Sequence, residues 1–129
     1  MKKIFIVDDD KMYLMIITRR IAKINADVVI ESYRNGMTAV EELKKLASEN
    51  QDLPDTILLD INMPVMDGWQ FLDEVERELP EILHKVKIYM VSTSIEATDK
   101  QKAMSNEHVL EYISKPISPE KLEEILGVK

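Results

Sequence analysis

One carboxylate, Asp60, stands where proteins with parallel sheets often carry out chemistry. It follows the apolar segment 56–59 and opens a loop that contains Pro64 and Gly68. Sites in open α/β sheets lie at the carboxyl ends of the strands, so a carboxylate between a buried strand and a Pro/Gly loop is well placed to react. Asp60 is therefore the first candidate for a reacting group.

Four further side chains occupy equivalent positions after other apolar segments. Asp8 and Asp9 end the first segment, Ser92 ends another, and Lys115 follows the last one. If these segments are strands of one parallel sheet, three acids, one hydroxyl and one ammonium group meet at the same edge. Such a set of groups is suited to the transfer of a phosphoryl group to a carboxylate.

In that chemistry Asp60 would be the nucleophile, because carboxylates form covalent intermediates such as aspartyl phosphates. An anionic nucleophile and an anionic phosphate repel each other, and a divalent cation held by nearby acids removes that repulsion. We predict Mg²⁺ as the cofactor, because it binds a few carboxylates together with water and phosphate oxygens. Its predicted binding residues are Asp8, Asp9, Asp60 and Asn62, the last through its backbone carbonyl.

The remaining two groups are hydrogen-bond donors. The hydroxyl of Ser92 and the ammonium of Lys115 would bind phosphoryl oxygens, where negative charge gathers. Each candidate also has an ordinary structural explanation by itself, as part of a turn, a loop or a helix cap. Asp10 is expected to act only as a cap or surface residue of the following helix. The combination of these groups at strand ends, rather than any single one, indicates the chemistry.

Strand-like and helix-like segments alternate along the chain and would position these groups. We predict strands at 3–8, 27–32, 56–60, 87–92 and 109–113, and helices at 11–24, 36–48, 67–78, 97–105 and 119–126. Four of the strand segments are nearly continuous in apolar residues, as expected for strands covered on both faces. The alternation predicts an α/β parallel sheet with helices on both sides.

The polar residues also predict the order of the strands. The segment 27–32 ends without convergent functional groups, which favours an edge position for it, the order 2-1-3-4-5, and a site between strands one and three. Ser118, Pro119 and Gly127 indicate the start and the end of the last helix. The first helix is expected to pack on the sheet through a broad apolar face: Met12, Met15, Ile16, Ile17, Ile21 and Ile24.

Composition restricts the class of protein. The length of 129 residues suits one domain spanning 1–129, and the net charge of −7 disfavours binding to nucleic acid or to anionic membranes. The absence of cysteine excludes disulfides and thiolate zinc sites. The N-terminal apolar run is too short for a signal peptide, and no run approaches the ~20 apolar residues that span a bilayer. We expect a single-domain cytoplasmic protein.

Together these motifs resemble the receiver domain of two-component response regulators over essentially the whole chain. The matching segments are 4–9, 58–68, 90–92 and 112–116. The resemblance implies a flavodoxin-like (βα)5 three-layer sandwich, a cis peptide bond between Lys115 and Pro116, and phosphorylation of Asp60 by a histidine kinase or a small phosphodonor. It also implies a switch in which Ser92 moves toward the phosphoryl group and Tyr112 turns inward.

On this interpretation the chain is a stand-alone signalling module without an output domain, and not a turnover enzyme. It would pass phosphate to a histidine phosphotransfer protein, or bind a downstream protein through the face of the fourth helix, fifth strand and fifth helix. Homodimerisation on phosphorylation is a further possibility. Asn62 and Ser94 are expected to tune the lifetime of the acyl phosphate, and the helix at 97–105 is expected to be the least stable. His84 and His108 are expected to be surface residues without a metal partner.

Two alternatives remain open at this stage. One is a pseudo-receiver, a scaffold that keeps the fold and binds a partner without phosphorylation. The other is a haloacid-dehalogenase-like phosphatase, which also uses an aspartate nucleophile, Mg²⁺, a hydroxyl and a lysine. That phosphatase scheme requires further metal-binding aspartates after the lysine, and no aspartate follows Lys115.

Overall fold

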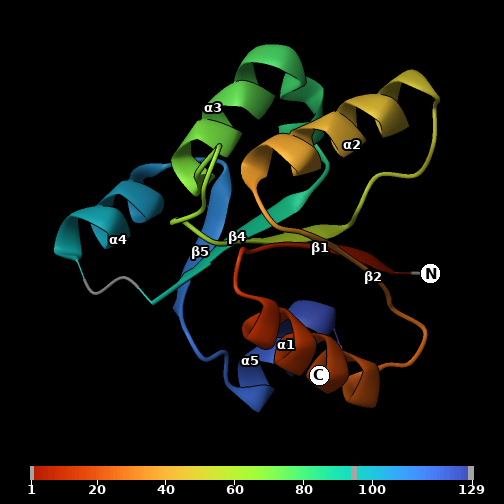
Figure 1. Cartoon of the computed structure of the whole chain (residues 1–129), viewed down its shortest axis with the longest axis vertical. Helices are drawn as coiled ribbons and strands as arrows, with labels where there is room; N and C mark the ends of the chain where they lie inside the picture. Colours follow the sequence, from red (N-terminus) through yellow and green to blue (C-terminus); the bar gives the residue numbers. More distant parts are fainter. Residues whose placement is uncertain (1, 94–95, 128–129) are drawn as a thin grey trace.

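The chain forms a parallel sheet with helices on both faces in a computed structural model that describes residues 2–93 and 96–127 (Figure 1). The strands are β1 (Lys3–Val7), β2 (Val29–Tyr33), β3 (Thr56–Leu59), β4 (Lys87–Ser92) and β5 (Val109–Ser114). The helices are α1 (Lys11–Ile24), α2 (Gly36–Ser48), α3 (Gly68–Glu78), the 3-10 helix η1 (Pro80–His84), α4 (Ala97–Ser105) and α5 (Pro119–Leu126). The strand order is β2-β1-β3-β4-β5, which confirms the predicted order and the flavodoxin-like (βα)5 sandwich.

The sheet separates two apolar cores. Helices α2, α3 and α4 lie on one side of it, and α1 and α5 lie on the other (Figure 1). Alternate residues of β1 point to opposite faces of the sheet. Phe5 and Val7 pack in the core between the sheet and helices α2 and α3, whereas Ile4 and Ile6 pack in the core between the sheet and helices α1 and α5. All four are fully buried, which explains why β1 is continuously apolar.

The register of the strands brings the candidate residues together. Val7 pairs with Leu59, and the backbone amide of Asp60 donates to the carbonyl of Val7 at 2.9 Å, so the acids that follow β1 and β3 lie side by side. At the other pair of strands, the amide of Lys115 donates to the carbonyl of Ser92 at 3.0 Å. Because all strands are parallel, these strand ends share one edge of the sheet.

Helix ends follow the local sequence signals. Ser118 caps α5 by accepting a hydrogen bond from the amide of Lys121, and Pro119 occupies its first turn. Gly127 ends α5 in the left-handed region at a φ of 74°, where glycine carries no steric cost. Within the described ranges, no helix has both the length and the apolar character needed to cross a membrane.

The prediction for the apolar face of α1 was too broad. Of the six apolar residues expected on that face, only Ile17 and Ile21 are buried, whereas Met12, Met15 and Ile16 are 44–70% exposed. A helix lying on one side of a sheet buries a narrow stripe, and apolar residues beside that stripe remain at the surface. The 3-10 helix η1 was also missed, since five residues are too few for a periodic apolar pattern to show.

Candidate functional site

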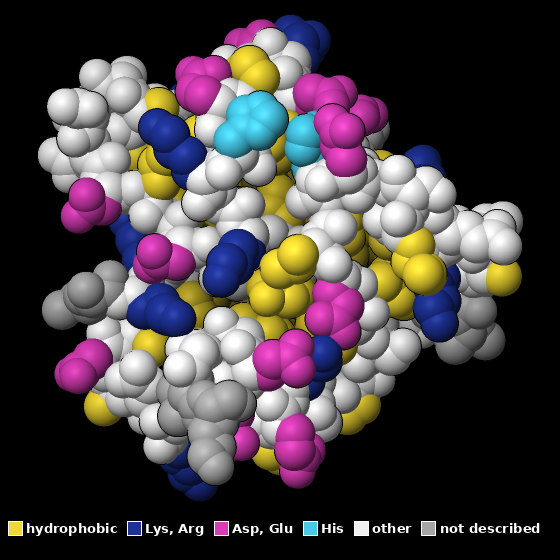
Figure 2. Space-filling view, turned by 180° about the vertical axis from the view of Figure 1, so that it is seen from behind, with side chains coloured by type: hydrophobic (Ala, Val, Ile, Leu, Met, Phe, Trp, Pro, Cys, Tyr) yellow, Lys and Arg dark blue, Asp and Glu magenta, His cyan; other side chains and the backbone are white. Residues whose placement is uncertain are grey.

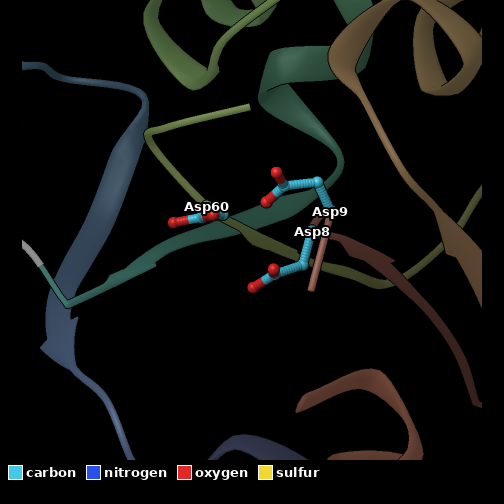
Figure 3. Close-up of side chains that lie close together, drawn as sticks. All are labelled: Asp8, Asp9 and Asp60. Carbon is cyan, nitrogen blue, oxygen red and sulfur yellow. The ribbon is translucent and has the colours of Figure 1, made fainter. Parts of the chain in front are cut away.

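Three carboxylates converge at the carboxyl edge of the sheet. Asp8 and Asp9 follow β1, Asp60 follows β3, and one oxygen of each lies within 4.8 Å of the others (Figure 3). Asp8 is 2% exposed and Asp60 is 7% exposed, whereas Asp9 is exposed. The cluster therefore has a buried floor and opens to solvent at Asp9.

The first helix begins directly at this cluster. The amide of Asp10 donates to Oδ1 of Asp8 at 3.0 Å, which turns the chain out of the strand. The carboxylate of Asp10 accepts hydrogen bonds from the amides of Met12 and Tyr13 and caps α1. The three consecutive acids thus divide into two at the site and one helix cap, which confirms the prediction for Asp10.

The loop after β3 holds Asp60 in place. Oδ1 of Asp60 accepts the amide of Ile61 at 2.9 Å, and the amide of Gly68 donates to the carbonyl of Ile61 at 2.8 Å. A Cβ at position 68 would lie 2.5 Å from the carbonyl oxygen of Asp60, so only glycine allows this close approach. The loop that follows Asp60 is thereby folded back against the backbone of the acid itself.

Lys115 reaches the cluster from the end of β5. Its Nζ lies 2.6 Å from Oδ2 of Asp8 and 3.8 Å from Oδ2 of Asp60, and its side chain is only 10% exposed. The peptide bond between Lys115 and Pro116 is cis, as the resemblance implied. The ammonium therefore lies between two buried carboxylates, within reach of any group attached to Asp60.

The electrostatic balance of the site favours a bound cation. Burial, and then the neighbouring charge of Asp8, raise the pKa of Asp60 to about 6. Burial also raises the pKa of Asp8, although its hydrogen bond to Lys115 acts in the opposite direction. The single positive charge of Lys115 thus does not balance the negative charges of the three carboxylates. Close, hard oxygen donors in this arrangement fit Mg²⁺, so the residues present suit the predicted cofactor.

The other predicted site residues have the following places. Ser92 ends β4 and is fully buried, and Asn62 is exposed in the loop after β3. Tyr112 is half-buried in β5 and packs against the core formed with α2 and α3. Ser94 lies outside the described residues. The roles assigned to these side chains in phosphoryl transfer and switching remain predictions.

Sequence reasoning missed an aromatic residue at the site. The ring centroid of Tyr13 lies 4.3 Å from Nζ of Lys115, and burial raises the pKa of its hydroxyl. One signal for it was available, because side chains in a helix lean toward its N-terminus and Tyr13 belongs to the first turn of α1. Position alone could not show that Lys115, 102 residues later, would lie over the ring.

The histidines are less isolated than the sequence indicated. Their rings stand edge to face with centroids 6.5 Å apart, and the two cyan side chains are adjacent in Figure 2. Nε2 of His108 lies 3.0 Å from Oε2 of Glu76, and the His108 side chain is 13% exposed. The description of His108 as a simple surface residue was therefore wrong, because folding brings η1, α3 and the segment before β5 together.

Comparison with known proteins decides the family. The sequence model for the response regulator receiver domain matches residues 4–127. The chain belongs to this family. It is accordingly a two-component receiver domain with an acidic metal site, and the family is one of signalling phosphoacceptors. Membership removes the basis for the haloacid-dehalogenase-like alternative.

Individual relatives agree with this assignment. The chain is 32% identical over 119 residues to the probable methanogenesis regulatory protein FilR2 of Methanothrix harundinacea, covering 92% of this chain and 75% of that protein. It is 30% identical over 125 residues to the hybrid signal transduction histidine kinase L of Dictyostelium discoideum, covering 96% of this chain but 7% of that kinase. The receiver thus forms a small part of some relatives.

Solved structures share the fold over nearly the whole chain. A two-component response regulator from Cytophaga hutchinsonii superposes with a TM-score of 0.88 at 26% identity, covering 98% of this chain and 95% of that one. The phosphorylated cyanobacterial phytochrome response regulator RcpA superposes with a TM-score of 0.76 at 32% identity, covering 98% and 90%. The architecture described above is therefore that of the receiver family.

Proposed function

We propose that this receiver accepts a phosphoryl group on Asp60 in a Mg²⁺-dependent reaction and thereby switches its binding to a partner protein. One observation carries the proposal: Asp60 lies at the open edge of the sheet, close to Asp8 and Asp9 and 3.8 Å from the Lys115 ammonium. An isolated carboxylate would repel a phosphodonor, but this one has both a place for a cation and a built-in donor.

Each side chain then has a defined task. A carboxylate oxygen of Asp60 forms a bond to phosphorus while the bond from phosphorus to the donor's leaving atom breaks. Lys115 and Ser92 donate hydrogen bonds to the phosphoryl oxygens. A bound Mg²⁺, held by Asp8, Asp9, Asp60 and the backbone carbonyl of Asn62, would supply the positive charge that lets the anionic groups approach.

Membership of the family supports a proposal for the phosphodonor, and the output is a further proposal. The similarity to the receiver part of a hybrid histidine kinase, and to a response regulator solved in phosphorylated form, supports phosphoryl transfer from a phosphohistidine protein. We propose that this receiver either passes the phosphoryl group on in a phosphorelay or docks on a target protein when phosphorylated. Pairing of two copies on phosphorylation remains a prediction.

The proposed output surface is the face of α4, β5 and α5. A groove of about 330 Å³ lies between α4 and β5, and its lining includes Ala103, Met104 and Tyr112. Two apolar side chains at this surface, Met104 and Leu110, are 72% and 60% exposed. Figure 2 shows hydrophobic side chains gathered on one face of the molecule among scattered charges. Movement of Tyr112 would alter this groove and, with it, partner binding.

The phosphorylation step is tested by the rate at which acetyl phosphate and Mg²⁺ modify the protein. We expect Lys115→Met and Asp9→Asn to slow the reaction by about tenfold or more. The first removes the ammonium that offsets the approaching anion, and the second removes a carboxylate proposed to hold Mg²⁺. Asp27→Asn, a substitution at an exposed aspartate in the turn before β2, serves as the matched control. Equal rates in all four proteins would contradict the assigned roles.

The switch is tested by beryllofluoride, an analogue of the phosphoryl group, and NMR spectra of the backbone amides. The proposal predicts shifted amide signals in α4 and β5 of the wild type, and smaller shifts there in Tyr112→Ala. Signals around Asp60 should shift equally in both proteins, because Tyr112→Ala leaves the acceptor intact. If the signals shifted only around the acid cluster in the wild type, the proposed output face of α4, β5 and α5 would be contradicted.

A further inference from the structure

The ring of Tyr13 forms one wall of the site around Lys115. Its centroid lies 4.3 Å from Nζ of Lys115, which is within the range of a cation–π interaction. The same Nζ lies 2.6 Å from Oδ2 of Asp8 and 3.8 Å from Oδ2 of Asp60. The ammonium is therefore held by two carboxylates and by an aromatic face that comes from a different element, α1.

The contribution of Tyr13 comes from its ring rather than from its hydroxyl. The hydroxyl oxygen is buried and has no hydrogen-bond partner among residues 2–93 and 96–127. The ring, in contrast, faces an ammonium whose side chain is 10% exposed, and cation–π attraction grows as the cation loses its water. The Tyr13 side chain also packs against the core between the sheet and helices α1 and α5.

Such a wall matters because a lysine has no fixed geometry of its own. Its ammonium is a point charge on a flexible four-carbon chain, and the carboxylate of Asp8 attracts it at 2.6 Å. The carboxylates of Asp8 and Asp60 attract the ammonium but do not fix the direction from which its flexible chain approaches them. The ring face gives it a second, apolar attachment that does not compete with an incoming phosphoryl oxygen for hydrogen bonds.

We propose that the ring of Tyr13 is a positioning element that keeps the Lys115 ammonium within reach of a phosphoryl group on Asp60. This inference rests on the function proposed above and adds a residue to it. Tyr13 touches neither the donor nor the reacting atoms in this scheme, and acts only through Lys115. A phenylalanine at this position should serve equally well, whereas an aliphatic residue of similar size should not.

The contact itself is tested without phosphorylation. In protein with ¹³C-labelled lysine side chains, the ring of Tyr13 should shift the ε-methylene proton signals of Lys115 upfield. Tyr13→Phe should retain that shift and Tyr13→Leu should lose it. Identical Lys115 signals in wild type and Tyr13→Leu would overturn the inference, whatever the phosphorylation assays show.

The consequence for the reaction is tested by initial rates with acetyl phosphate and Mg²⁺. We expect about tenfold slower phosphorylation in Tyr13→Leu and a rate within about twofold of wild type in Tyr13→Phe. Leu14→Ala removes packing from the same helix turn and the same core, and should leave the rate unchanged. An equal loss in Leu14→Ala, or no loss in Tyr13→Leu, would overturn the inference.

A double-mutant comparison separates positioning from general damage to the site. In a Lys115→Met background, which has no ammonium for the ring to hold, Tyr13→Leu should cost much less than it does in the wild type. The same loss in both backgrounds would mean that Tyr13 is structural. If the wild type took up no phosphoryl group, the proposed function would fall, and the lysine signals alone would then decide whether the contact exists.

Discussion

At the scale of single residues, burial changes what Asp60 does. An exposed aspartate is ionised at neutral pH, but burial and the charge of Asp8 raise the pKa of Asp60 to about 6. At pH 7 the carboxylate is still mainly ionised, but burial destabilises its negative charge, so the state of this side chain depends on the cations around it. The buried negative charge of Asp60 should also lower the stability of the metal-free protein.

Proton linkage gives the direction in which the free energy of unfolding changes with pH. Between the unfolded pKa of 3.8 and the folded pKa of about 6, the folded protein binds more protons than the unfolded chain. Stability in metal-free buffer should therefore fall as the pH rises through this window. Asp60→Asn should raise the free energy of unfolding at pH 7 by up to about 3 kcal/mol, and by little at pH 4.

Urea unfolding of wild type and Asp60→Asn at intervals from pH 4 to pH 8 measures this effect. Asp27→Asn, at an exposed position, is the control and should show no such trend. A stabilisation by Asp60→Asn that is the same at pH 4 and at pH 7 would show that the effect does not come from the ionisation of Asp60.

The sequence predicted the acids well and the groups around them less well. Asp8, Asp9, Asp60 and Lys115 were recognisable because each follows an apolar strand, and parallel strands end at one edge. The ring of Tyr13 and the contact between His108 and Glu76 depend on tertiary packing of distant segments. No local pattern marks such contacts, since each partner has an unremarkable sequence context.

At the scale of elements, the loop between β3 and α3 contains backbone strain. Val65 has a φ of 68°, a left-handed conformation that disfavours β-branched residues, and its side chain is 70% exposed. Asn50 adopts a similar φ of 58°, and asparagine tolerates this region far better. The strain lies in the same loop that folds back on Asp60.

Val65→Asn should therefore raise the free energy of unfolding by about 1 kcal/mol, because strain is relieved and little buried surface is lost. Val65→Ala removes the β-branch but lacks the short polar side chain that lets asparagine adopt this conformation, and should gain clearly less. Thermal or urea unfolding of the three proteins gives the comparison. If Val65→Asn proved no more stable than Val65→Ala, the strain at this position would be negligible.

Helix α4 is the element whose stability we expect to be lowest. Its only buried residue is Ala103, and among the described residues no side-chain hydrogen bond caps its N-terminus. Its backbone amides should exchange with solvent deuterium faster than those of α2, where five residues are buried. Equal protection of α4 and α2 in hydrogen-exchange measurements would contradict this expectation.

The elements themselves were predictable to within about two residues at each end. Helices α1, α2, α4 and α5 and strand β4 have the predicted bounds, and the other four strands differ by one or two residues. Burial within an element was harder to predict, because a run of apolar residues does not show where the contact stripe ends. For that reason α1 buries only Ile17 and Ile21 of the broad apolar face that the sequence predicted.

At the scale of the whole molecule, we expect the stability of the fold to depend on metal binding at the acid cluster. Three carboxylates held together by the sheet repel one another, and a cation that binds only the folded chain stabilises it. At Mg²⁺ concentrations about ten times the dissociation constant, the melting temperature should rise by roughly 4–6 °C. The fold thus maintains a charge cluster that a bound cation would relieve.

Differential scanning fluorimetry with and without millimolar Mg²⁺ measures this coupling. The shift should be large in the wild type and much smaller in Asp9→Asn, where an exposed ligand is removed with little effect on packing. The Asp27→Asn control should keep the full shift. An unchanged melting temperature of the wild type in Mg²⁺ would argue against a functional acid cluster.

Asp60 is the residue that we propose receives the phosphoryl group. The most direct measurement is intact mass after incubation with acetyl phosphate and Mg²⁺, followed by peptide mapping of the adduct. We predict one added phosphoryl group, located on Asp60, absent from Asp60→Asn and absent without Mg²⁺. An adduct on another residue, or the lack of both an adduct and a beryllofluoride-induced spectral change, would contradict the account and leave a receiver-shaped scaffold.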